Sequence, residues 1–308
     1  MNEMIAVRGL RKLYGNKVAV DGIDFEVHRG EIVGLLGPNG AGKTTTLEIL
    51  SALRPATSGS VLVAGADPAK DPGAVRSRLG AVLQAAALDP VMTALEVLTL
   101  QGRLRGLRSG EARERASVAL EQAGLADCGA DRIGTLSGGQ RRRVDLAVAV
   151  AGNPDVLLLD EPTAGLDPVS RLALWDHLRT LAARGTAILL STQDLNEAER
   201  LAGRLVVLRA GRVVASATSA RLKSDVGTRS LVLALGAHDH RDQALDVAAR
   251  IGMSAVAGDQ DGQVRVRLGD DDQHVGQCLA ALATSGIEVT HLTLDEPTLD
   301  DVFVRLTN

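Results

Sequence analysis

The sequence predicts an α/β fold built on a parallel sheet, and three observations support this prediction. Two short, fully apolar runs, Val156–Leu159 and Ala187–Leu190, are bounded by polar residues, as the central strands of parallel sheets are. The segment Val169–Arg184 between them has apolar residues at helical spacing. A third apolar run, Glu31–Leu36, leads into a glycine-rich loop and a helix near Lys43–Leu53. Strands that alternate with helices in this way indicate an α/β sheet.

The first domain is expected to span residues 1–215. Strand-like runs at Met4–Val7 and Phe25–Val27 precede the central strands. A long stretch of helical pattern predicts a helical insertion at about residues 85–135. Two further strand-like runs flank Ala210-Gly211, and we expect them to form a hairpin that closes the domain.

The remaining residues predict a linker and a smaller second domain. Residues 216–228 are mostly small and polar, which is typical of a linker. Residues 229–308 alternate strand-like and helical runs, as a compact α+β domain does. The first 215 residues carry 26 basic and 24 acidic groups and the rest carry 8 and 14, so the second domain is acidic. Neither part has the basic excess that nucleic-acid binding requires.

Length and cysteine usage predict neither a membrane-spanning nor a disulfide-linked protein. The best candidate for a spanning helix, Val144–Gly152, contains Asp145 and is much shorter than the roughly 18 residues required. The first residues lack the basic and apolar regions of a signal peptide. Cys128 and Cys278 are isolated, so we expect two unpaired thiols in a reducing compartment and no zinc site.

A phosphate-binding loop follows the strand Glu31–Leu36. It fits the pattern GxxxxGK[ST] in full, and its residues are Gly37, Pro38, Asn39, Gly40, Ala41, Gly42, Lys43 and Thr44. Glycines let backbone N–H groups turn toward the phosphates of a nucleotide, and the following helix adds its positive dipole. We expect Lys43 to reach the β- and γ-phosphates and the Thr44 hydroxyl to bind Mg²⁺. A glycine loop without function is the alternative, and the strand–helix context argues against it.

Two carboxylates, Asp160 and Glu161, end the buried strand Val156–Leu159. Downstream of a phosphate loop, a carboxylate at this place can hold Mg²⁺, and we assign this role to Asp160. The neighbouring Glu161 is placed to orient the attacking water and to accept its proton. An apolar strand that ends in Asp-Glu is, by itself, also compatible with a purely structural role.

A second glycine-rich segment precedes the helical run Arg141–Val150. It follows Leu136 and consists of Ser137, Gly138, Gly139 and Gln140. Such a segment at the start of a helix forms a second site for anions. One nucleotide does not need two such sites in one chain, so we expect this segment to bind the nucleotide of a second subunit. A glycine-rich helix start without function is the alternative.

Along the chain, the phosphate loop, the segment Ser137–Gln140 and the pair Asp160-Glu161 follow one another, and in this order they resemble the motifs of the ATP-binding cassette (ABC) ATPases. The resemblance covers residues 1–215 and implies a phosphate-loop core of the RecA type with an antiparallel β subdomain and a helical subdomain. It implies ATP and Mg²⁺ as cofactors. It also implies a head-to-tail pair of ATPase subunits, most simply a homodimer, in which each nucleotide contacts Ser137–Gln140 of the other chain.

Four further residues match family motifs by their position. Tyr14 matches the aromatic residue that stacks on adenine, and Thr45 extends the phosphate-loop motif. Gln84 matches the glutamine that binds the nucleotide and metal and links them to the membrane partner. Asp167 lies in Ala164-Gly165-Leu166-Asp167, which resembles the D-loop of the family and implies contact with nucleotide.

The resemblance implies that Glu161, Lys43 and Gln193 are the catalytic residues. At the position of Gln193 the family usually has a histidine that contacts the γ-phosphate. An amide donates a hydrogen bond but carries no charge and does not titrate near neutral pH. We therefore expect real but reduced ATPase activity.

Three segments resemble the daunorubicin/doxorubicin-resistance-type ATPases more narrowly. They are Ser137–Leu146, Ser191–Ala198 and the tail Glu296–Phe303. This resemblance implies export of a drug, natural product or lipid-like molecule through a separate, polytopic ABC-2-type permease, with this chain at the cytoplasmic face of the membrane. The tail also has a structural interpretation, because Thr298 and Asp301 can cap an amphipathic helix. A regulatory or permease-linked role is the alternative.

Two other functions are compatible with the motifs. An ABC ATPase that acts on ribosomes usually carries two cassettes, and one that repairs DNA carries inserted coiled coils or zinc cysteines; this chain has one cassette and neither insertion. The chain could also be the ATPase of an importer, and only the resemblance to the daunorubicin/doxorubicin-resistance-type ATPases argues against this. No nucleic-acid partner is expected.

Overall fold

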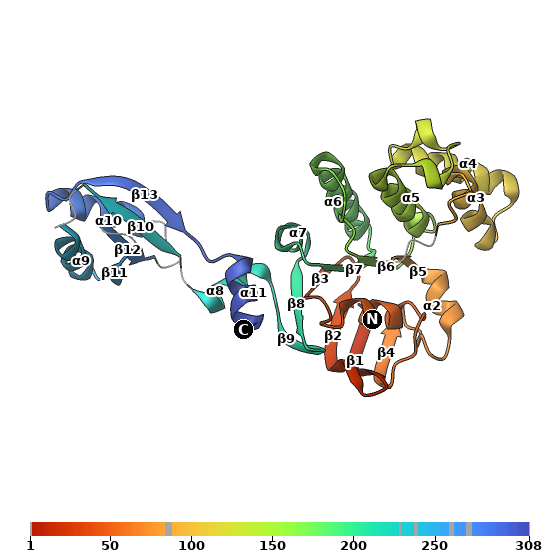
Figure 1. The fold of residues 1–308 in the computed structure, drawn as a ribbon, viewed down its shortest axis with the longest axis horizontal. Coiled ribbons are helices and arrows are strands. Elements are labelled where there is room, and N and C mark those ends of the chain that lie inside the picture. Colours follow the sequence, from red (N-terminus) through yellow and green to blue (C-terminus); the bar gives the residue numbers. More distant parts are fainter. Residues whose placement is uncertain are drawn as a thin grey trace. The chain divides into compact units, whose positions relative to one another are not determined.

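The chain forms two compact units in the computed structural model, Met1–Thr218 and Ser219–Asn308 (Figure 1). The structure describes residues 2–83, 88–227, 229–236, 240–258, 262–268 and 273–307. The first unit contains a six-stranded and a three-stranded sheet, and the second contains a four-stranded sheet. The predicted fold class, an α/β core with a further α+β part, is confirmed.

The six-stranded sheet is the centre of the first unit. Its strand order is β5-β6-β7-β3-β8-β9. The strands are β3 (Ile32–Leu36), β5 (Leu79–Val82), β6 (Val156–Asp160), β7 (Ala187–Thr192), β8 (Arg204–Arg209) and β9 (Arg212–Ala217). All neighbours are parallel except β8 and β9, which form the predicted hairpin. The carboxyl ends of β3, β6 and β7 therefore meet at one edge of the sheet, where α/β proteins bind their ligands.

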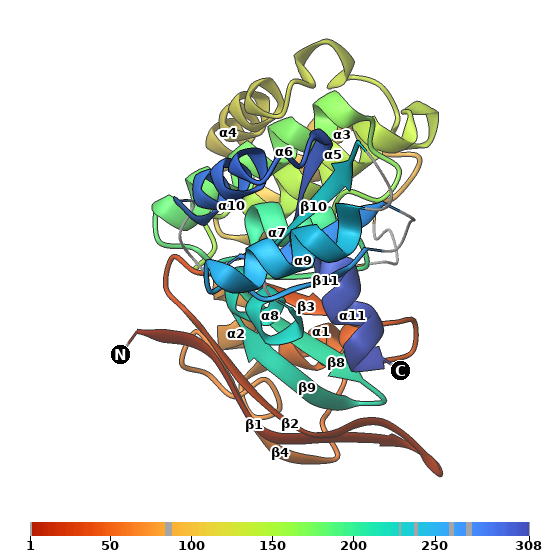
Figure 2. The same cartoon turned by 90° about the vertical axis from the view of Figure 1, so that its left-hand side faces the viewer.

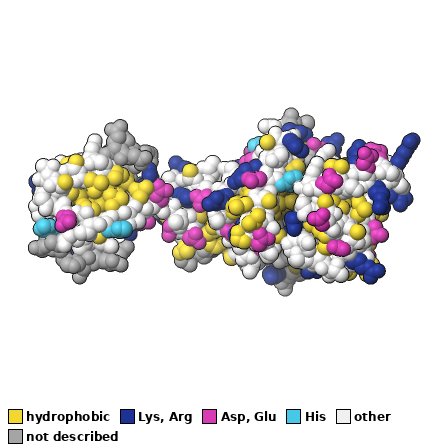
Figure 3. Space-filling view, turned by 90° about the horizontal axis from the view of Figure 1, so that it is seen from above, with side chains coloured by type: hydrophobic (Ala, Val, Ile, Leu, Met, Phe, Trp, Pro, Cys, Tyr) yellow, Lys and Arg dark blue, Asp and Glu magenta, His cyan; other side chains and the backbone are white. Residues whose placement is uncertain are grey.

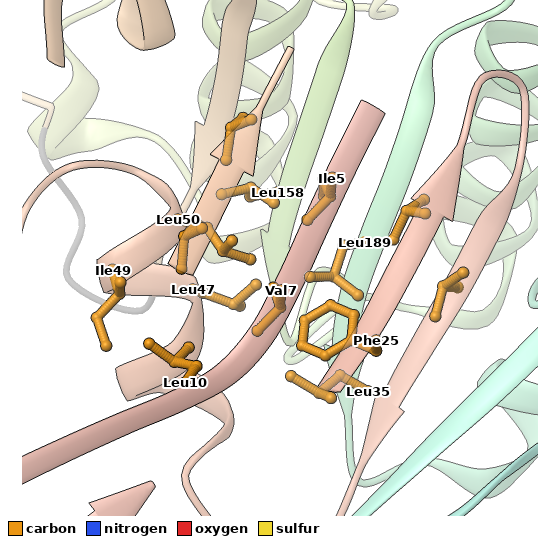
Figure 4. Close-up of a cluster of buried hydrophobic side chains, with 14 of the residues drawn as sticks. Ile5, Val7, Leu10, Phe25, Leu35, Leu47, Ile49, Leu50, Leu158 and Leu189 are labelled. Atoms are coloured by element: carbon orange, nitrogen blue, oxygen red, sulfur yellow. The ribbon is translucent and has the colours of Figure 1, made fainter. Parts of the chain in front are cut away.

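An antiparallel sheet covers one face of the central sheet. It has the order β2-β1-β4, with β1 (Glu3–Tyr14), β2 (Lys17–His28) and β4 (Ser58–Val63). Its apolar residues pack with helix α1 (Lys43–Leu50) against the central strands, as Figure 4 shows for Val7, Phe25 and Leu189. The predicted strands Met4–Val7 and Phe25–Val27 are parts of these longer strands, and Tyr14 is the last residue of β1.

Helices cover the other face of the central sheet. They include α6 (Pro168–Ala183) and the short α7 (Leu195–Leu201) (Figure 2). Because side chains alternate along a strand, Leu158 points to the antiparallel sheet while Leu157 packs with Trp175 on α6. The phosphate-loop edge is thus held between two separate apolar cores.

A helical region with its own core completes the first unit. Its elements are α3 (Ala94–Leu104), α4 (Ser109–Gln122), the 3₁₀ turns Ala126–Cys128 and Ile133–Thr135, and α5 (Gly138–Val150). Helix α2 (Pro72–Arg78) lies outside this region, because its buried Val75 belongs to the core shared with the antiparallel sheet. Helix α3 begins at a capping box between Thr93 and Glu96. Leu98 of α3 and Val144 of α5 belong to one cluster, so α5 packs on the predicted insertion of residues 85–135 although it lies outside that range.

The second unit packs two helices on one face of an antiparallel sheet. The sheet order is β11-β12-β10-β13, with β10 (Ser230–Leu235), β11 (Ala255–Ala257), β12 (Gln263–Arg267) and β13 (Val289–Asp295). Its core is shared with α9 (Arg241–Arg250) and α10 (Gln273–Thr284). The last helix, α11 (Leu299–Thr307), contacts α8 (Ser219–Val226).

Helix α8 occupies most of residues 216–228, for which the sequence predicts a linker. Its Leu222 is buried, and the Arg305 guanidinium of α11 donates to the carbonyl oxygens of Asp225 and Val226 at 3.2 Å each. The sequence pattern does not show α8 because its packing partner lies about 80 residues further along the chain. Among the described residues, no helix combines the length and apolar character that crossing a bilayer requires.

Candidate nucleotide-binding site

The phosphate loop leaves no room for side chains at two of its glycines. Gly37 has φ +155°, and a Cβ there would lie 2.4 Å from the carbonyl oxygen of Leu208. Gly42 has φ +106°, and a Cβ there would lie 2.7 Å from the carbonyl oxygen of Ala19. Gly42 also precedes α1 without a side-chain cap, so the first N–H groups of α1 have no side-chain acceptor from the N-cap residue. Such a helix start suits an anion.

Lys43 lies over this loop. Its side chain is 6% exposed, and its Nζ donates to the carbonyl oxygens of Gly37 at 2.6 Å and Pro38 at 3.1 Å. Burial lowers the pKa of Lys43, and the charges of Glu161 and Asp160 oppose this shift. The ammonium group is therefore held at the loop by carbonyl oxygens that a phosphate group would replace as its partners.

Asp160 forms an oxygen-rich cluster with two hydroxyl groups. The Thr44 hydroxyl donates to Asp160 Oδ2 at 2.9 Å, and the Ser191 hydroxyl donates to Asp160 Oδ1. Carboxylate and hydroxyl oxygens are the ligands that Mg²⁺ prefers, and Mg²⁺ usually binds one or two protein groups together with substrate phosphates. Thr44 and Asp160 thus fit a Mg²⁺ ion shared with a nucleotide. The described residues contain no group of three or more acidic, His or Cys side chains that is placed to hold a metal ion by itself.

Glu161 lies beside Gln193 at the ends of β6 and β7. The Gln193 side-chain amide donates to Glu161 Oε1 at 2.6 Å. The backbone of Glu161 has φ +49°, a left-handed conformation that residues with a side chain rarely adopt, and its N–H donates to the Ser191 carbonyl oxygen at 2.9 Å. This geometry brings together two of the three predicted catalytic residues.

A cleft of about 410 Å³ is lined by part of the phosphate loop and by Glu161, whereas Asp160 and Gln193 are not among its lining residues. Its lining residues are Tyr14, Lys17, Ala19, Asn39, Gly40, Gly42, Lys43, Thr44, Thr45 and Glu161. Tyr14 is 40% exposed, and Lys12 Nζ lies 5.0 Å from the centre of its ring. A half-exposed aromatic ring, a phosphate loop and a carboxylate in one cleft suit a nucleotide.

The segment Ser137–Gln140 does not line the cleft. It starts α5 with a capping box, in which Gln140 N–H donates to the Ser137 hydroxyl at 3.2 Å and Ser137 N–H donates to Gln140 Oε1 at 2.9 Å. A Cβ added at Gly138 would meet nothing within 4 Å, and one at Gly139 would lie 3.7 Å from the nearest atom, in Leu166. The two glycines therefore form no tight contact within the described part of the chain. This placement is required if the segment binds the nucleotide of another subunit.

Asp167 is another predicted residue that does not line the cleft. Asp167 caps α6 by accepting from the N–H groups of Val169 and Ser170 and from the Ser170 hydroxyl, and these bonds lower the pKa of Asp167. Gln84 lies outside the described residues.

Comparison with known proteins decides the family. The family model described as "ABC transporter" matches residues 20–164, and the one described as "ATP-binding protein DrrA1-3-like, C-terminal domain" matches residues 218–307. The daunorubicin resistance ATP-binding protein DrrA3 of Streptomyces coeruleorubidus is 42% identical over 98% of this chain and 95% of its own length. This chain belongs to the ABC transporter ATP-binding proteins of the DrrA type. It is an ABC ATPase, as the motifs predict.

Other relatives and solved structures agree with this family. The linearmycin resistance ATP-binding protein LnrL of Bacillus subtilis is 33% identical over 99% of this chain and 98% of its own length. A solved ATP-binding subunit of an ABC transporter superposes with a TM-score of 0.67 at 30% identity, over 72% of this chain and 92% of that one. The cassette MJ0796, solved as a dimer bound to ADP and Pi, gives 0.66 at 29% identity, over 70% and 98%.

The structure adds residues to this ABC site that the motifs do not predict. Lys17 and Ala19 of β2 line the cleft, and Ser191 contacts Asp160. Ser191 had a signal in the sequence, because it ends an apolar strand just as Asp160 does, and the two residues pair in the sheet. Lys17 had no such signal in the sequence, because only the hairpin of β1 and β2 brings it next to Tyr14.

Gln193→His is expected to raise the ATP turnover number several-fold. A charged imidazole donates a hydrogen bond about 1 kcal/mol stronger than a neutral amide does, which corresponds to about fivefold. The gain should grow as the pH falls toward about 6.5, where histidine becomes charged. Turnover measured at pH 6 to 8 tests this. Equal turnover in both proteins across that range would contradict the view that Gln193 limits the rate.

A buried carboxyl, Glu197 of α7, lies behind the site. It is fully buried, and the Trp175 indole N–H donates to its Oε1 at 3.3 Å. Oε2 has no hydrogen-bond partner among the described residues. Burial raises the pKa of Glu197, although the nearby hydroxyls of Thr192 and Thr163 favour the ionised form. Burial thus makes the protonated form of Glu197 more favourable than it would be in water.

Glu197→Gln is expected to remove the loss of stability that ionisation of Glu197 causes as the pH rises. Because the folded pKa lies above the ordinary value of 4.5, this carboxyl stabilises the fold fully below that pH, and the contribution is lost as the pH rises through the folded pKa. The unfolding free energy of the variant, relative to that of the parent, should therefore increase between pH 5 and 8. Urea unfolding of both proteins at several pH values measures this difference. Glu199→Gln, an exposed change on the same helix, is the control. A constant difference between Glu197→Gln and the parent would contradict the assignment.

Proposed function

We propose that this chain powers an ABC-2-type exporter that moves a drug, natural product or lipid-like molecule out of the cell. Two copies of the chain would work on a separate, polytopic permease at the cytoplasmic face of the membrane. The observation that carries the proposal is the match over the whole chain, second unit included, to ATP-binding proteins named for daunorubicin and doxorubicin resistance. A shorter match, over 70% of the chain, is a Nod factor export protein of Cupriavidus metallidurans, 45% identical.

The cleft would bind Mg²⁺ and ATP with its base near Tyr14 and its phosphates at the phosphate loop. The loop N–H groups and Lys43 would hold the phosphates, and Thr44 and Asp160 would hold Mg²⁺, which neutralises phosphate charge when bound. Glu161 lies where it can accept a proton from an attacking water, and Gln193 orients its carboxylate through the 2.6 Å hydrogen bond. Gln84 would connect the site to the permease.

Pairing would complete each site with residues of the other chain. Ser137–Gln140 would contact the partner's nucleotide, and Asp167 would lie at the interface through the D-loop. The position of Ser137–Gln140 outside the cleft of its own chain supports this arrangement, as does the dimer of MJ0796. ATP would close the pair, and hydrolysis with release of products would reopen it.

The surface argues against nucleic acid as the alternative partner. On the face seen in Figure 3, basic and acidic side chains are interspersed over the first unit. Many of the arginines are paired with carboxylates, as Arg8 is with Glu26 and Arg212 with Asp21. A nucleic-acid partner needs a continuous basic surface to neutralise phosphates.

The export proposal is tested by deleting the gene from its host and measuring how much of several amphipathic antibiotics the cells accumulate. Accumulation of at least one compound should rise, and the intact gene should restore it while the Glu161→Gln gene should not. Restoration by the Glu161→Gln gene would contradict ATP-driven export. Unchanged accumulation of every compound would contradict export of this substrate class.

A further inference from the structure

Arg142 of helix α5 binds the main chain that carries the catalytic carboxylates. Its Nη2 donates to the carbonyl oxygens of Asp160 at 2.6 Å and Glu161 at 2.8 Å, and its Nε donates to that of Pro162 at 3.1 Å. The residue is half-buried between α5 and the end of β6. One guanidinium group therefore binds three consecutive carbonyl oxygens, those of the last residue of β6 and of the first two residues of the loop that follows it.

This loop has a conformation that needs support. Glu161 has φ +49°, a left-handed conformation that is unfavourable for a residue with a side chain. Besides Arg142, the Glu161 carbonyl oxygen accepts only from Ala164 N–H, at 3.2 Å, among the bonds of the described residues. Loss of Arg142 would leave the carboxylate of Glu161 on a less constrained backbone, and a shift of about 1 Å in a catalytic group can cost about 100-fold in rate.

The same helix begins with the segment proposed to contact the partner's nucleotide. Arg142 lies two residues after Gln140, whose side chain closes the capping box with Ser137. Within one rigid helix, a movement of Ser137–Gln140 is transmitted to Arg142, and from there to the Glu161 backbone. Ser137–Gln140 would belong to the nucleotide site of the partner, whereas Glu161 belongs to the site of its own chain.

We infer that Arg142 is a positioning residue that couples the two nucleotide sites of the pair. When Ser137–Gln140 contact the partner's nucleotide, Arg142 holds Glu161 in place for hydrolysis in its own cleft. The inference rests on the proposed function, because it requires the head-to-tail pair. It does not require the permease.

Arg143 offers a matched control on the same helix. Its Nη1 donates to the carbonyl oxygens of Gly124 at 3.1 Å and Ala123 at 3.4 Å, at the end of α4. It is also half-buried and also binds main-chain oxygens, but these hydrogen bonds lead to α4 and not to the loop after β6. A change at Arg143 therefore removes a comparable structural contact without reaching Glu161.

The test compares Arg142→Gln, Arg142→Lys and Arg143→Gln in the full chain. For each protein we would measure the dissociation constant of a fluorescent ATP analogue, the ATP turnover number, the Hill coefficient for ATP and the melting temperature. Arg142→Gln should lower turnover about 10- to 100-fold and bring the Hill coefficient to one, with nucleotide affinity within about twofold. Arg142→Lys should restore part of the turnover, and Arg143→Gln should change the melting temperature more than the turnover.

Three results would overturn the inference. In the first, Arg142→Gln keeps the turnover and Hill coefficient of the parent. In the second, it loses turnover only in proportion to its folded fraction or bound nucleotide, as Arg143→Gln would. In the third, the parent itself has a Hill coefficient of one and forms no dimer with ATP, which contradicts the proposed pair and the coupling together. A parent that pairs and an unaffected Arg142→Gln would contradict the coupling alone.

Discussion

Glu161→Gln is expected to lower ATP turnover by about 10²- to 10⁴-fold, the usual contribution of a general base. The amide has the size of the carboxylate and keeps an oxygen that can accept from Gln193, so the cleft should keep its shape. It cannot accept a proton from water. Nucleotide affinity should stay close to that of the parent, and the paired, ATP-bound state should accumulate because hydrolysis no longer opens it.

Turnover and sedimentation with ATP and Mg²⁺ measure these two effects. Glu114→Gln is the control, because Glu114 is an exposed carboxylate on α4 outside the cleft lining. It should leave both quantities unchanged. Normal turnover in Glu161→Gln would remove this residue as the base.

Lys43→Ala is expected to weaken nucleotide binding and to abolish measurable turnover. A hydrogen bond from a charged group contributes about 1.5–3 kcal/mol, so losing the ammonium group should raise the dissociation constant for ATP about 10- to 100-fold. The effect should be larger for ATP than for AMP, because Lys43 is proposed to contact the outer phosphates. Titration with fluorescent analogues of both nucleotides measures this difference.

Lys70→Ala is the control for this prediction, because Lys70 is exposed and pairs with Asp67 near the start of α2, away from the cleft lining. Its nucleotide affinities should equal those of the parent. If Lys43→Ala binds ATP as tightly as Lys70→Ala does, the ammonium group does not hold the phosphates.

The α/β core could be predicted because its strands are short, wholly apolar and bounded by polar residues. Strands β6 and β7 bury every residue, and this pattern needs no knowledge of neighbours. Strand β4 could not be predicted in the same way. It buries only Val61 and Val63 and contains Gly59, so its place in the sheet depends on pairing with β1. Helix α8 likewise depends on α11.

The candidate site divides in a similar way. The phosphate loop follows from spacing, because the glycines and Lys43 are contiguous in the chain. The role of Arg142 could not be predicted, because its contacts with the carbonyl oxygens of Asp160 and Glu161 exist only in the fold. The same holds for Glu197, whose contact with Trp175 joins two helices. Arg142 could equally have been an exposed residue of a polar helix face, which is what the run Arg141–Arg143 indicates in the sequence.

The most direct test of the account is to purify tagged Glu161→Gln protein from detergent-solubilised membranes of its host in the presence of ATP and Mg²⁺. We would then identify the proteins that accompany it by mass spectrometry, with tagged Lys43→Ala protein as the control. If this chain powers an exporter, one polytopic membrane protein should be recovered in near-equal amount with the tagged chain. Recovery from the soluble fraction alone, or with ribosomes or DNA, would contradict the exporter function.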